Sequence, residues 1–206
     1  MDINYVILKL LIKYIYHSSF KKDMRITISG TPGSGKSTIA KLLAKKLGYK
    51  HYSVGDFRRN LAKKQNMSIN DLNKLGETTD FTDKEADNWQ KQLSKEDNFV
   101  IDGRLSYYFI PDSVKIYLDA DEKVRAERIY NEKRNLEFFK NVGEALNGLR
   151  ERQESDKKRY KKYYNIDPFQ KKHYDIVIDT TNKEINQVLE KIYNKIKSHP
   201  KSTASS

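Results

Sequence analysis

The chain has 206 residues, no cysteine, and 40 Lys and Arg against 28 Asp and Glu, giving a formal net charge of +12 at pH 7. This length suits one domain with a substantial core, and the absence of cysteine excludes disulfides and thiolate metal sites. No apolar run approaches the roughly 18 to 20 residues of a membrane helix, so we expect no membrane span and a cytoplasmic protein. The positive charge fits nucleic acid as well as a site for anionic nucleotides.

The first 23 residues contain an apolar segment, Tyr5–Tyr16, that two lysines four residues apart interrupt. Lysines at this spacing share a helical face, so an amphipathic helix at a membrane surface is one interpretation. We favour an accessory leader, because neither a basic start nor a small-residue cleavage site marks a signal peptide. We therefore divide the chain into an extension (1–23), one domain (24–198) and a tail (199–206) that we expect to be disordered.

Short segments rich in β-branched and aromatic residues alternate with helical patterns along the domain. This alternation predicts an α/β fold with a five-stranded parallel sheet covered by helices on both faces, and ligands at the carboxyl ends of the strands. The predicted strands are Arg25–Ser29, Lys50–Ser53, Phe99–Asp102, Val114–Leu118 and Ile176–Asp179. The predicted helices are Ser37–Leu47, Phe57–Lys64, Lys84–Leu93, Glu122–Lys133, Gly143–Tyr163 and Lys183–Ile196.

The segment that joins the first strand to the first helix has the pattern G-x-x-x-x-G-K-[ST] of a phosphate-binding loop. Its glycines let backbone N–H groups turn toward phosphate oxygens, and the helix N-terminus adds a favourable dipole. Lys36 is then placed to bridge the β- and γ-phosphates, and the Ser37 hydroxyl to bind Mg²⁺. Because strand, loop and helix are all present, a chance glycine-rich turn is the weaker interpretation. The predicted contacts with a nucleoside triphosphate are Gly30, Thr31, Pro32, Gly33, Ser34, Gly35, Lys36, Ser37 and Thr38.

Charged residues follow the ends of other predicted strands. Asp102 ends an apolar strand, where it can hold Mg²⁺ together with Ser37, although Asp-Gly is also a common turn signal. Arg58 and Arg104 come just after strand ends, where a guanidinium group can grip a phosphate, and the alternative for each is a solvated surface arginine. The polar stretch Asn131–Asn147 carries no strand signal, and we interpret it as a mobile flap over the phosphate site.

Another group of charges lies on the predicted helix Gly143–Tyr163. Arg152, Asp156 and Arg159 share one helical face and could grip a sugar hydroxyl and a base or phosphate. On spacing alone, a surface ladder of ion pairs is the better interpretation. The basic and aromatic stretch Lys157–Tyr164 is typical of a solvated helical face, and nothing in it resembles an RNA-binding motif.

At these residues the chain resembles the cytidylate kinases, which are nucleoside monophosphate kinases, and among them the compact archaeal-type members. The resemblance extends from Met24 to about Lys197. Its most specific marker is Arg152-x₃-Asp156-x₂-Arg159 with the tyrosines that follow, and this marker favours a substrate site over a surface ladder. The other markers are Ile28–Thr38, Tyr52–Arg58, Val100–Leu105, Arg125–Ile129 and Tyr174–Asp179.

The resemblance implies a P-loop NTPase fold with a monophosphate-binding helical insert and a lid. It also implies ATP and Mg²⁺ as cofactors and phosphorylation of CMP and dCMP to the diphosphates. We expect a monomer that binds these small nucleotides and no nucleic acid. The implied catalytic residues are Lys36, Arg104 and Arg128, and the implied acceptor-binding residues are Ser53, Arg58, Arg104, Arg152, Asp156 and Arg159.

Two departures from the family concern the base of the acceptor. Leu105 stands where longer bacterial members have an aspartate, and the segment 80–92 has no clear counterpart of an arginine that they use. Two alternative functions therefore stay open. One is a kinase for another nucleoside monophosphate or a small metabolite, and the other is an NTP-dependent RNA-binding or regulatory protein.

Overall fold

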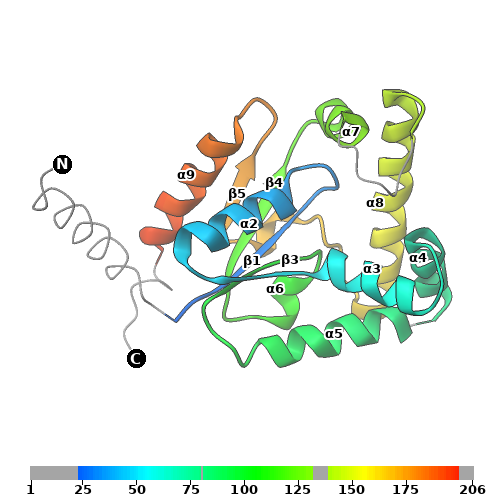
Figure 1. Cartoon of the computed structure of the whole chain (residues 1–206), viewed down its shortest axis with the longest axis horizontal. Coiled ribbons are helices and arrows are strands. Elements are labelled where there is room, and N and C mark those ends of the chain that lie inside the picture. The colour runs from blue at the N-terminus through cyan, green and yellow to red at the C-terminus, as the bar shows by residue number, and fades with distance from the viewer. Residues whose placement is uncertain (1–22, 80, 132–138, 200–206) are drawn as a thin grey trace, which may run out of the picture.

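The computed structural model describes residues 23–79, 81–131 and 139–199. In this part of the chain, five strands form one parallel sheet in the order β2-β3-β1-β4-β5, and helices lie on both of its faces (Figure 1). The strands are β1 (Arg25–Gly30), β2 (Lys50–Ser53), β3 (Phe99–Asp102), β4 (Val114–Asp119) and β5 (Ile176–Asp179). The helices are α2 (Lys36–Leu47), α3 (Val54–Lys64), α4 (Ile69–Thr78), α5 (Phe81–Leu93), α6 (Ser106–Phe109), α7 (Glu122–Asn131), α8 (Val142–Tyr164) and α9 (Ile185–Lys197). The predicted α/β fold and its strands are confirmed, and no strand end differs from the prediction by more than one residue.

Helices α2 and α9 cover one face of the sheet. Side chains alternate along a strand, so Ile26 and Ile28 of β1 both point to this face, where they are fully buried. Helix α9 presents Val188, Ile192 and Ile196, four residues apart, to the same core. Burial of one such side chain contributes about 1.5 to 3 kcal/mol, so this layer holds α2 and its first turn firmly against the sheet.

Helices α5, α6 and α8 cover the other face with a more aromatic core. Phe99 and Ile101 alternate with the residues of β3 that face α2, and both are fully buried here. Tyr117 of β4 packs against Tyr174 with ring centroids 4.8 Å apart. This second layer fixes α8 across the carboxyl ends of the strands, which is where the sequence predicted ligands.

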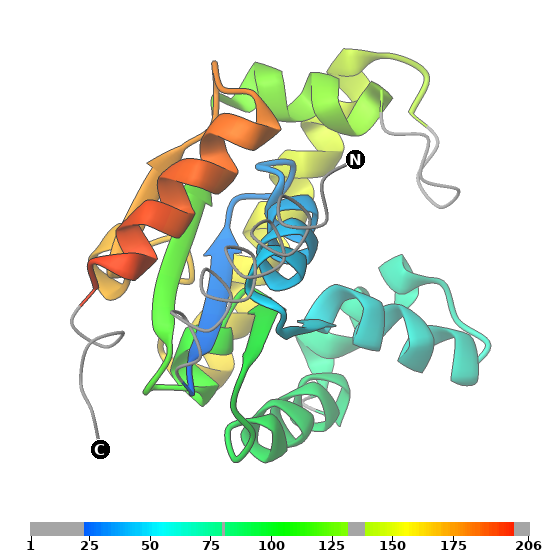
Figure 2. The same ribbon diagram turned by 60° about the vertical axis from the view of Figure 1, so that its left-hand side comes forward.

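The segment between β2 and β3 forms a helical insert, α3 to α5, that extends to one side of the sheet (Figure 2). Leu61, Ala62 and Leu72 give α3 and α4 a small core of their own. Helix α4 was not predicted, although the Ser68 side chain accepts a hydrogen bond from the Asp71 backbone N–H at 3.1 Å, a standard way to begin a helix.

The predicted helix Gly143–Tyr163 is confirmed to within one residue at each end, and residues 142–147 of the stretch interpreted as a flap belong to it. Helix α8 begins at Val142, because the Asn141 side chain caps it by accepting the Glu144 N–H at 2.9 Å. Residues 132–138 lie outside the described part of the chain, as do residues 1–22 of the extension and the tail from residue 200, so the predictions about them stay predictions. None of the described helices is long and apolar enough to cross a membrane.

Candidate active site

The phosphate-binding loop connects β1 to α2 at the centre of the sheet. Gly30 has φ +143°, and a Cβ there would lie 1.9 Å from the Leu118 carbonyl oxygen. The next backbone N–H, of Thr31, donates to that same oxygen at 3.2 Å, so the loop starts pressed against β4. Gly35, with φ +86°, then turns the chain into α2, which begins at Lys36. The backbone N–H groups in the first turn of α2 have no acceptor within the helix, and we expect them to bind an anion.

A buried arginine of α7 supports the phosphate-binding loop through hydrogen bonds. The buried Arg125 of α7 donates from Nε to the Ala120 carbonyl at 3.0 Å and from Nη1 to the Pro32 carbonyl at 3.2 Å. A Cβ at Gly33 would lie 2.8 Å from the Arg125 carbonyl, so α7 and the loop are in close contact. The sequence placed Arg125 on a helix but did not predict that it supports the phosphate-binding loop. Its partners are backbone carbonyl groups, which every residue has, so no sequence pattern indicates them.

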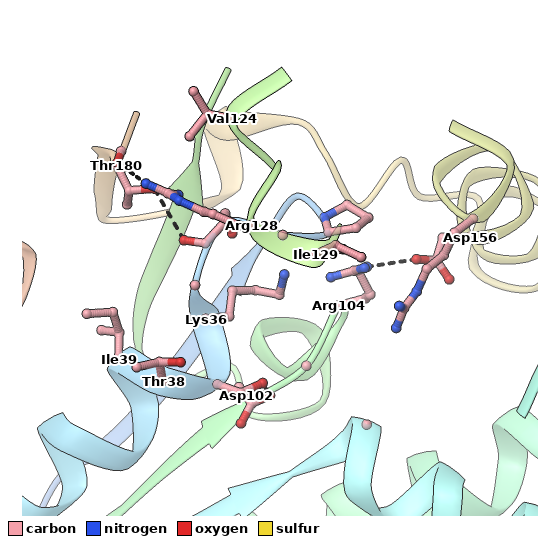
Figure 3. A pocket seen from close by; sticks show the side chains of 18 of the residues that line it. Lys36, Thr38, Ile39, Asp102, Arg104, Val124, Arg128, Ile129, Asp156 and Thr180 are labelled. Atoms are coloured by element: carbon pink, nitrogen blue, oxygen red, sulfur yellow. Dashed lines mark hydrogen bonds and ion pairs between the residues drawn. The ribbon is translucent and has the colours of Figure 1, made fainter. Parts of the chain in front are cut away.

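Lys36 lies at the centre of the site, between Arg128 and Arg104 (Figure 3). Its Nζ donates to the Thr31 carbonyl at 2.6 Å. Burial lowers the pKa of the Lys36 ammonium, and repulsion from Arg104 and Arg152 lowers it further. A group of cations held this close is stabilised by an anion, so the environment of Lys36 is suited to phosphate.

Asp102 accepts hydrogen bonds on both of its oxygens. Oδ2 accepts from the hydroxyls of Ser37 at 2.8 Å and Ser53 at 3.1 Å, and His51 Nε2 lies 2.9 Å from Oδ1. Burial alone would raise the pKa of Asp102, but the His51 and Ser37 hydrogen bonds hold it below its ordinary value. An ionised carboxylate beside a hydroxyl of the phosphate loop is an oxygen donor set that fits Mg²⁺.

The register of the sheet explains this arrangement. Parallel neighbours Ser53 and Asp102 are paired, as are His51 and Val100, so all four side chains share the face that α2 covers. The sequence had identified Asp102 and Ser53 but found no role for His51. His51 lies two residues before Ser53 on a predicted strand, and alternate residues of a strand share a face. This spacing could have indicated that His51 lies on the same face of the sheet as Ser53.

Arg104 joins the phosphate loop to α8. Its Nη1 donates to the Gly30 carbonyl at 2.9 Å and its Nε to Asp156 Oδ2 at 2.7 Å. Asp156 also accepts from Arg159 Nη2 at 2.6 Å. Burial alone would raise the pKa of the Asp156 carboxyl, but Arg104, Arg159 and Arg152 lower it to about 2, so Asp156 is ionised at neutral pH.

Next to Arg58 and Arg159 lies a further buried carboxylate that the sequence did not single out. Asp83 Oδ1 accepts from Arg58 Nη1 at 2.6 Å and from Arg159 Nη1 at 3.2 Å. Arg58 also donates from Nη2 to the Asn73 side chain at 3.1 Å. These contacts show that neither Arg58 nor Arg159 is a solvated surface arginine, and both are buried.

Two further predicted site residues, Arg128 and Ser53, make hydrogen bonds with protein groups. Arg128 donates to the Thr180 hydroxyl at 3.0 Å and to the Thr180 carbonyl at 2.7 Å, which places its guanidinium against the loop after β5. Ser53 is buried and caps α3 by accepting the Asp56 N–H at 3.3 Å. The catalytic role of Arg128 and the substrate role of Ser53 stay predictions.

One cavity of about 810 Å³ collects most of the predicted residues, and its walls come from α2, the insert, α7, α8 and the loop after β5. Of the described residues that the sequence singled out, Gly30, Thr31 and Ser53 do not line it. Among the described residues there is also no group of three or more His, Cys, Asp or Glu that could hold a metal ion by itself. The predicted residues that line the cavity are Pro32, Gly33, Ser34, Gly35, Lys36, Ser37, Thr38, Arg58, Asp102, Arg104, Arg128, Arg152, Asp156 and Arg159.

A parallel sheet with a phosphate loop after β1, a carboxylate at the end of β3 and a cavity that both of them line defines a P-loop kinase. The solved structure of shikimate kinase from Acinetobacter baumannii has this fold. It superposes with a TM-score of 0.58 over 88% of this chain and 97% of that chain, at 17% sequence identity.

The particular family follows from the sequence comparisons. A model of the cytidylate kinase-like family matches residues 25–182. Cytidylate kinase of Archaeoglobus fulgidus is 38% identical over 173 residues, which are 81% of this chain and 91% of that protein. Cytidylate kinase of Methanocaldococcus jannaschii is 39% identical over 171 residues, 80% of this chain and 93% of that protein. The chain belongs to the cytidylate kinase-like family.

Proposed function

We propose that the protein transfers the γ-phosphoryl group of ATP to the phosphate of CMP, and of dCMP, forming ADP and the pyrimidine nucleoside diphosphate. The observation that carries this proposal is that Lys36 of the phosphate loop and the Arg152, Asp156 and Arg159 face of α8 line one cavity. Family membership supports cytidylate as the acceptor. We further propose that the protein acts as a monomer in the cytoplasm.

The donor half of the reaction depends on the phosphate loop. Lys36 and the N–H groups at the start of α2 bind the β- and γ-phosphates and neutralise the charge that moves toward the β–γ bridging oxygen. Ser37 and Asp102 would hold Mg²⁺, which, when bound, withdraws charge from the same phosphates. To do this Lys36 leaves the Thr31 carbonyl, and the exchange is favourable because a phosphate beside the ammonium raises its lowered pKa.

The acceptor half requires positioning rather than acid–base chemistry. The acceptor phosphate is already an anion, so it attacks without a general base, and the arginines of the cavity offset the repulsion between the two phosphates. Arg104 is placed to do so, because its side chain spans from the phosphate loop to α8. Asp156, ionised at neutral pH, accepts hydrogen bonds from hydroxyl groups of the acceptor sugar, and Arg152 and Arg159 flank it.

A screen of acceptors tests this function. ADP formation from ATP and Mg²⁺ is measured with CMP, dCMP, UMP, AMP, shikimate and RNA in separate reactions. We expect the highest kcat/KM with CMP or dCMP and no stimulation by RNA. Preference for another monophosphate or for shikimate would replace the proposed acceptor, and ATP turnover only with RNA would replace the enzyme class.

A further inference from the structure

Asp83 joins three helices at a single carboxylate. It lies in the first turn of α5 and its side chain is 4% exposed. Its two partners come from distant parts of the chain, since Arg58 belongs to α3 and Arg159 to α8. Of these described residues, both arginines line the cavity and Asp83 does not. Asp83 therefore reaches any ligand in the cavity only through the two arginines.

The contacts continue through the cavity wall as an alternating chain of charges. Arg58 pairs with Asp83, Asp83 with Arg159, Arg159 with Asp156, and Asp156 with Arg104. The series runs from the insert across α8 to the residue that contacts the phosphate loop. An alternating series of this kind fixes the direction of each guanidinium fork, because every arginine in it has an aspartate within ion-pair distance.

Stability alone does not account for this arrangement. Buried ion pairs often contribute no net stability, because taking the charges out of water costs as much as their attraction returns. Within the described residues, Arg159 Nε and the Thr82 hydroxyl next to Asp83 are also buried without a hydrogen-bond partner. A network that leaves such atoms unsatisfied is typical of a functional site.

We propose that Asp83 is a positioning residue of the acceptor site, which holds Arg58 and Arg159 in the orientation that receives the nucleoside monophosphate. Both side chains are long, and their free rotation would otherwise have to be lost when the acceptor binds. Asp83 removes that rotation beforehand and ties the insert to α8. This inference rests on the proposed function, because it takes this side of the cavity as the acceptor side.

Asp87 gives a matched control on the same helix. It lies one turn after Asp83 and is buried, and it accepts a hydrogen bond from the Tyr164 hydroxyl. Among the described residues it does not line the cavity, and no hydrogen bond or ion pair joins it to Arg58 or Arg159. Asp87→Asn thus removes a buried carboxylate from α5 without releasing an arginine.

The experiment compares Asp83→Asn with Asp87→Asn in the full-length protein. Steady-state kinetics are recorded with the acceptor and ATP varied separately, and acceptor binding without ATP is measured by calorimetry. For Asp83→Asn we expect the KM and Kd of CMP to rise about tenfold or more, while kcat and the KM of ATP change less than about threefold. For Asp87→Asn all four quantities should stay within about twofold of the wild type.

Thermal unfolding of both variants separates positioning from a structural role. The proposal is overturned if Asp83→Asn raises the KM of ATP together with that of CMP. It is also overturned if Asp83→Asn and Asp87→Asn change the KM of CMP by the same factor. Should Asp83→Asn fail to fold, Asp83→Glu serves in its place. It keeps the charge but displaces the carboxylate, and an unchanged KM for CMP in that variant would overturn the proposal.

The wild type tests the proposed function separately. If it prefers another monophosphate, the cytidylate assignment fails, and the same comparison with that acceptor still decides the role of Asp83. If it phosphorylates no monophosphate, both inferences fail together.

Discussion

At the scale of single residues, the site is built from side chains whose charge is adjusted by their surroundings. Burial, and then repulsion from Arg104 and Arg152, lower the pKa of the Lys36 ammonium. Asp102 and Asp156 keep carboxyl pKa values below the ordinary range in spite of burial. A carboxylate that stays ionised can bind a metal ion or a hydroxyl, and a crowded cation binds phosphate. The site is therefore prepared for two anionic nucleotides.

Lys36→Met should lower kcat by about 10² to 10³ while the fold persists, because the lost interaction acts mainly on charge that develops during transfer. The steady-state rate and the circular dichroism spectrum are the measurements. Lys45→Met is the control, since Lys45 is an exposed lysine in the last turn of the same helix. Full turnover by a folded Lys36→Met protein would refute the assignment of the phosphate loop.

His51→Ala should raise the Mg²⁺ concentration that gives the half-maximal rate. The change removes one of the three hydrogen bonds that orient the Asp102 carboxylate, an effect of about 1 kcal/mol or roughly fivefold. The rate is measured against Mg²⁺ at fixed ATP, and Mn²⁺ binding by electron paramagnetic resonance gives a second readout. His173→Ala is the control, because it also removes an imidazole, but one that stacks on Tyr107 and not one that contacts Asp102. An equal metal requirement in all three proteins would show that His51 does not orient Asp102.

Sequence motifs identified residues such as Lys36, but they did not identify the residues that hold such side chains in place by hydrogen bonds. Lys36, Ser37 and Asp102 follow from local patterns, because the phosphate loop and the strand end are short stretches of chain. Asp83 and Arg159 are 76 residues apart, and His51 and Asp102 are 51 residues apart. Contacts over such separations depend on how the elements pack, which a single sequence does not record.

At the scale of elements, the strands and long helices were predictable because their apolar periodicity matches the faces that they bury. Helix α4 was missed because it is short, and its Ile69 and Leu72 pack in a small core that is separate from the sheet. The start of α8 was predicted to within one residue, although its N-terminal part packs on α7, through Ala145 and Leu149, rather than on the sheet. Apolar periodicity therefore identifies a long helix even where it packs on another helix, whereas a short helix outside the main core is harder to recognise.

Helix α5 makes the stability of the fold depend on pH. Burial raises the pKa of Asp87 to about 6, although the Tyr164 hydrogen bond acts in the opposite direction. The folded state therefore takes up a proton at a higher pH than the unfolded chain, whose carboxyl has its ordinary pKa of 3.8. The contribution of this group to stability thus rises as pH falls through about 6 and levels off below about 4.

Asp87→Asn should remove this dependence and should not destabilise the protein at pH 7.5. The free energy of unfolding is measured by urea denaturation at pH 7.5 and pH 5.0 for both proteins. On lowering the pH, the wild type should gain on the order of 1 kcal/mol more than the variant, once solvent screening is allowed for. Parallel pH profiles would mean that Asp87 titrates at its ordinary pKa in the folded state.

At the scale of the whole molecule, the cavity lies between parts that have their own small cores. Figure 2 shows the insert with α3 and α4 beside the sheet, and α7 apart from it at the top of the view. The first part is held by the Leu61, Ala62 and Leu72 core, and the second by the core around Ala126. Parts with separate cores can move as units over a fixed sheet, which suits a kinase that must exclude water from ATP.

Met24 is the first described residue that packs in the main core. Met24 is 4% exposed, and its carbonyl accepts the Asn98 N–H at 3.0 Å, next to the first pair of the β1–β3 ladder. Arg25 then forms an ion pair with Asp97 at 3.0 Å. These contacts are made by residues from position 24 onward, so a protein that begins at Met24 contains both partners of each.

A protein that begins at Met24 should keep both its stability and its kinetics. The shortened chain loses the hydrogen bond between the exposed side chains of Asp23 and Asn98, a contact of about 1 kcal/mol or less. We expect the Tm to change by less than about 3 °C and the KM values for ATP and CMP to change by less than about twofold. Thermal unfolding and kinetics of the two proteins are compared in the same buffer. A fall in Tm of about 5 °C or more would mean that residues 1–23 pack on the domain and contribute more than about 1 kcal/mol to its stability.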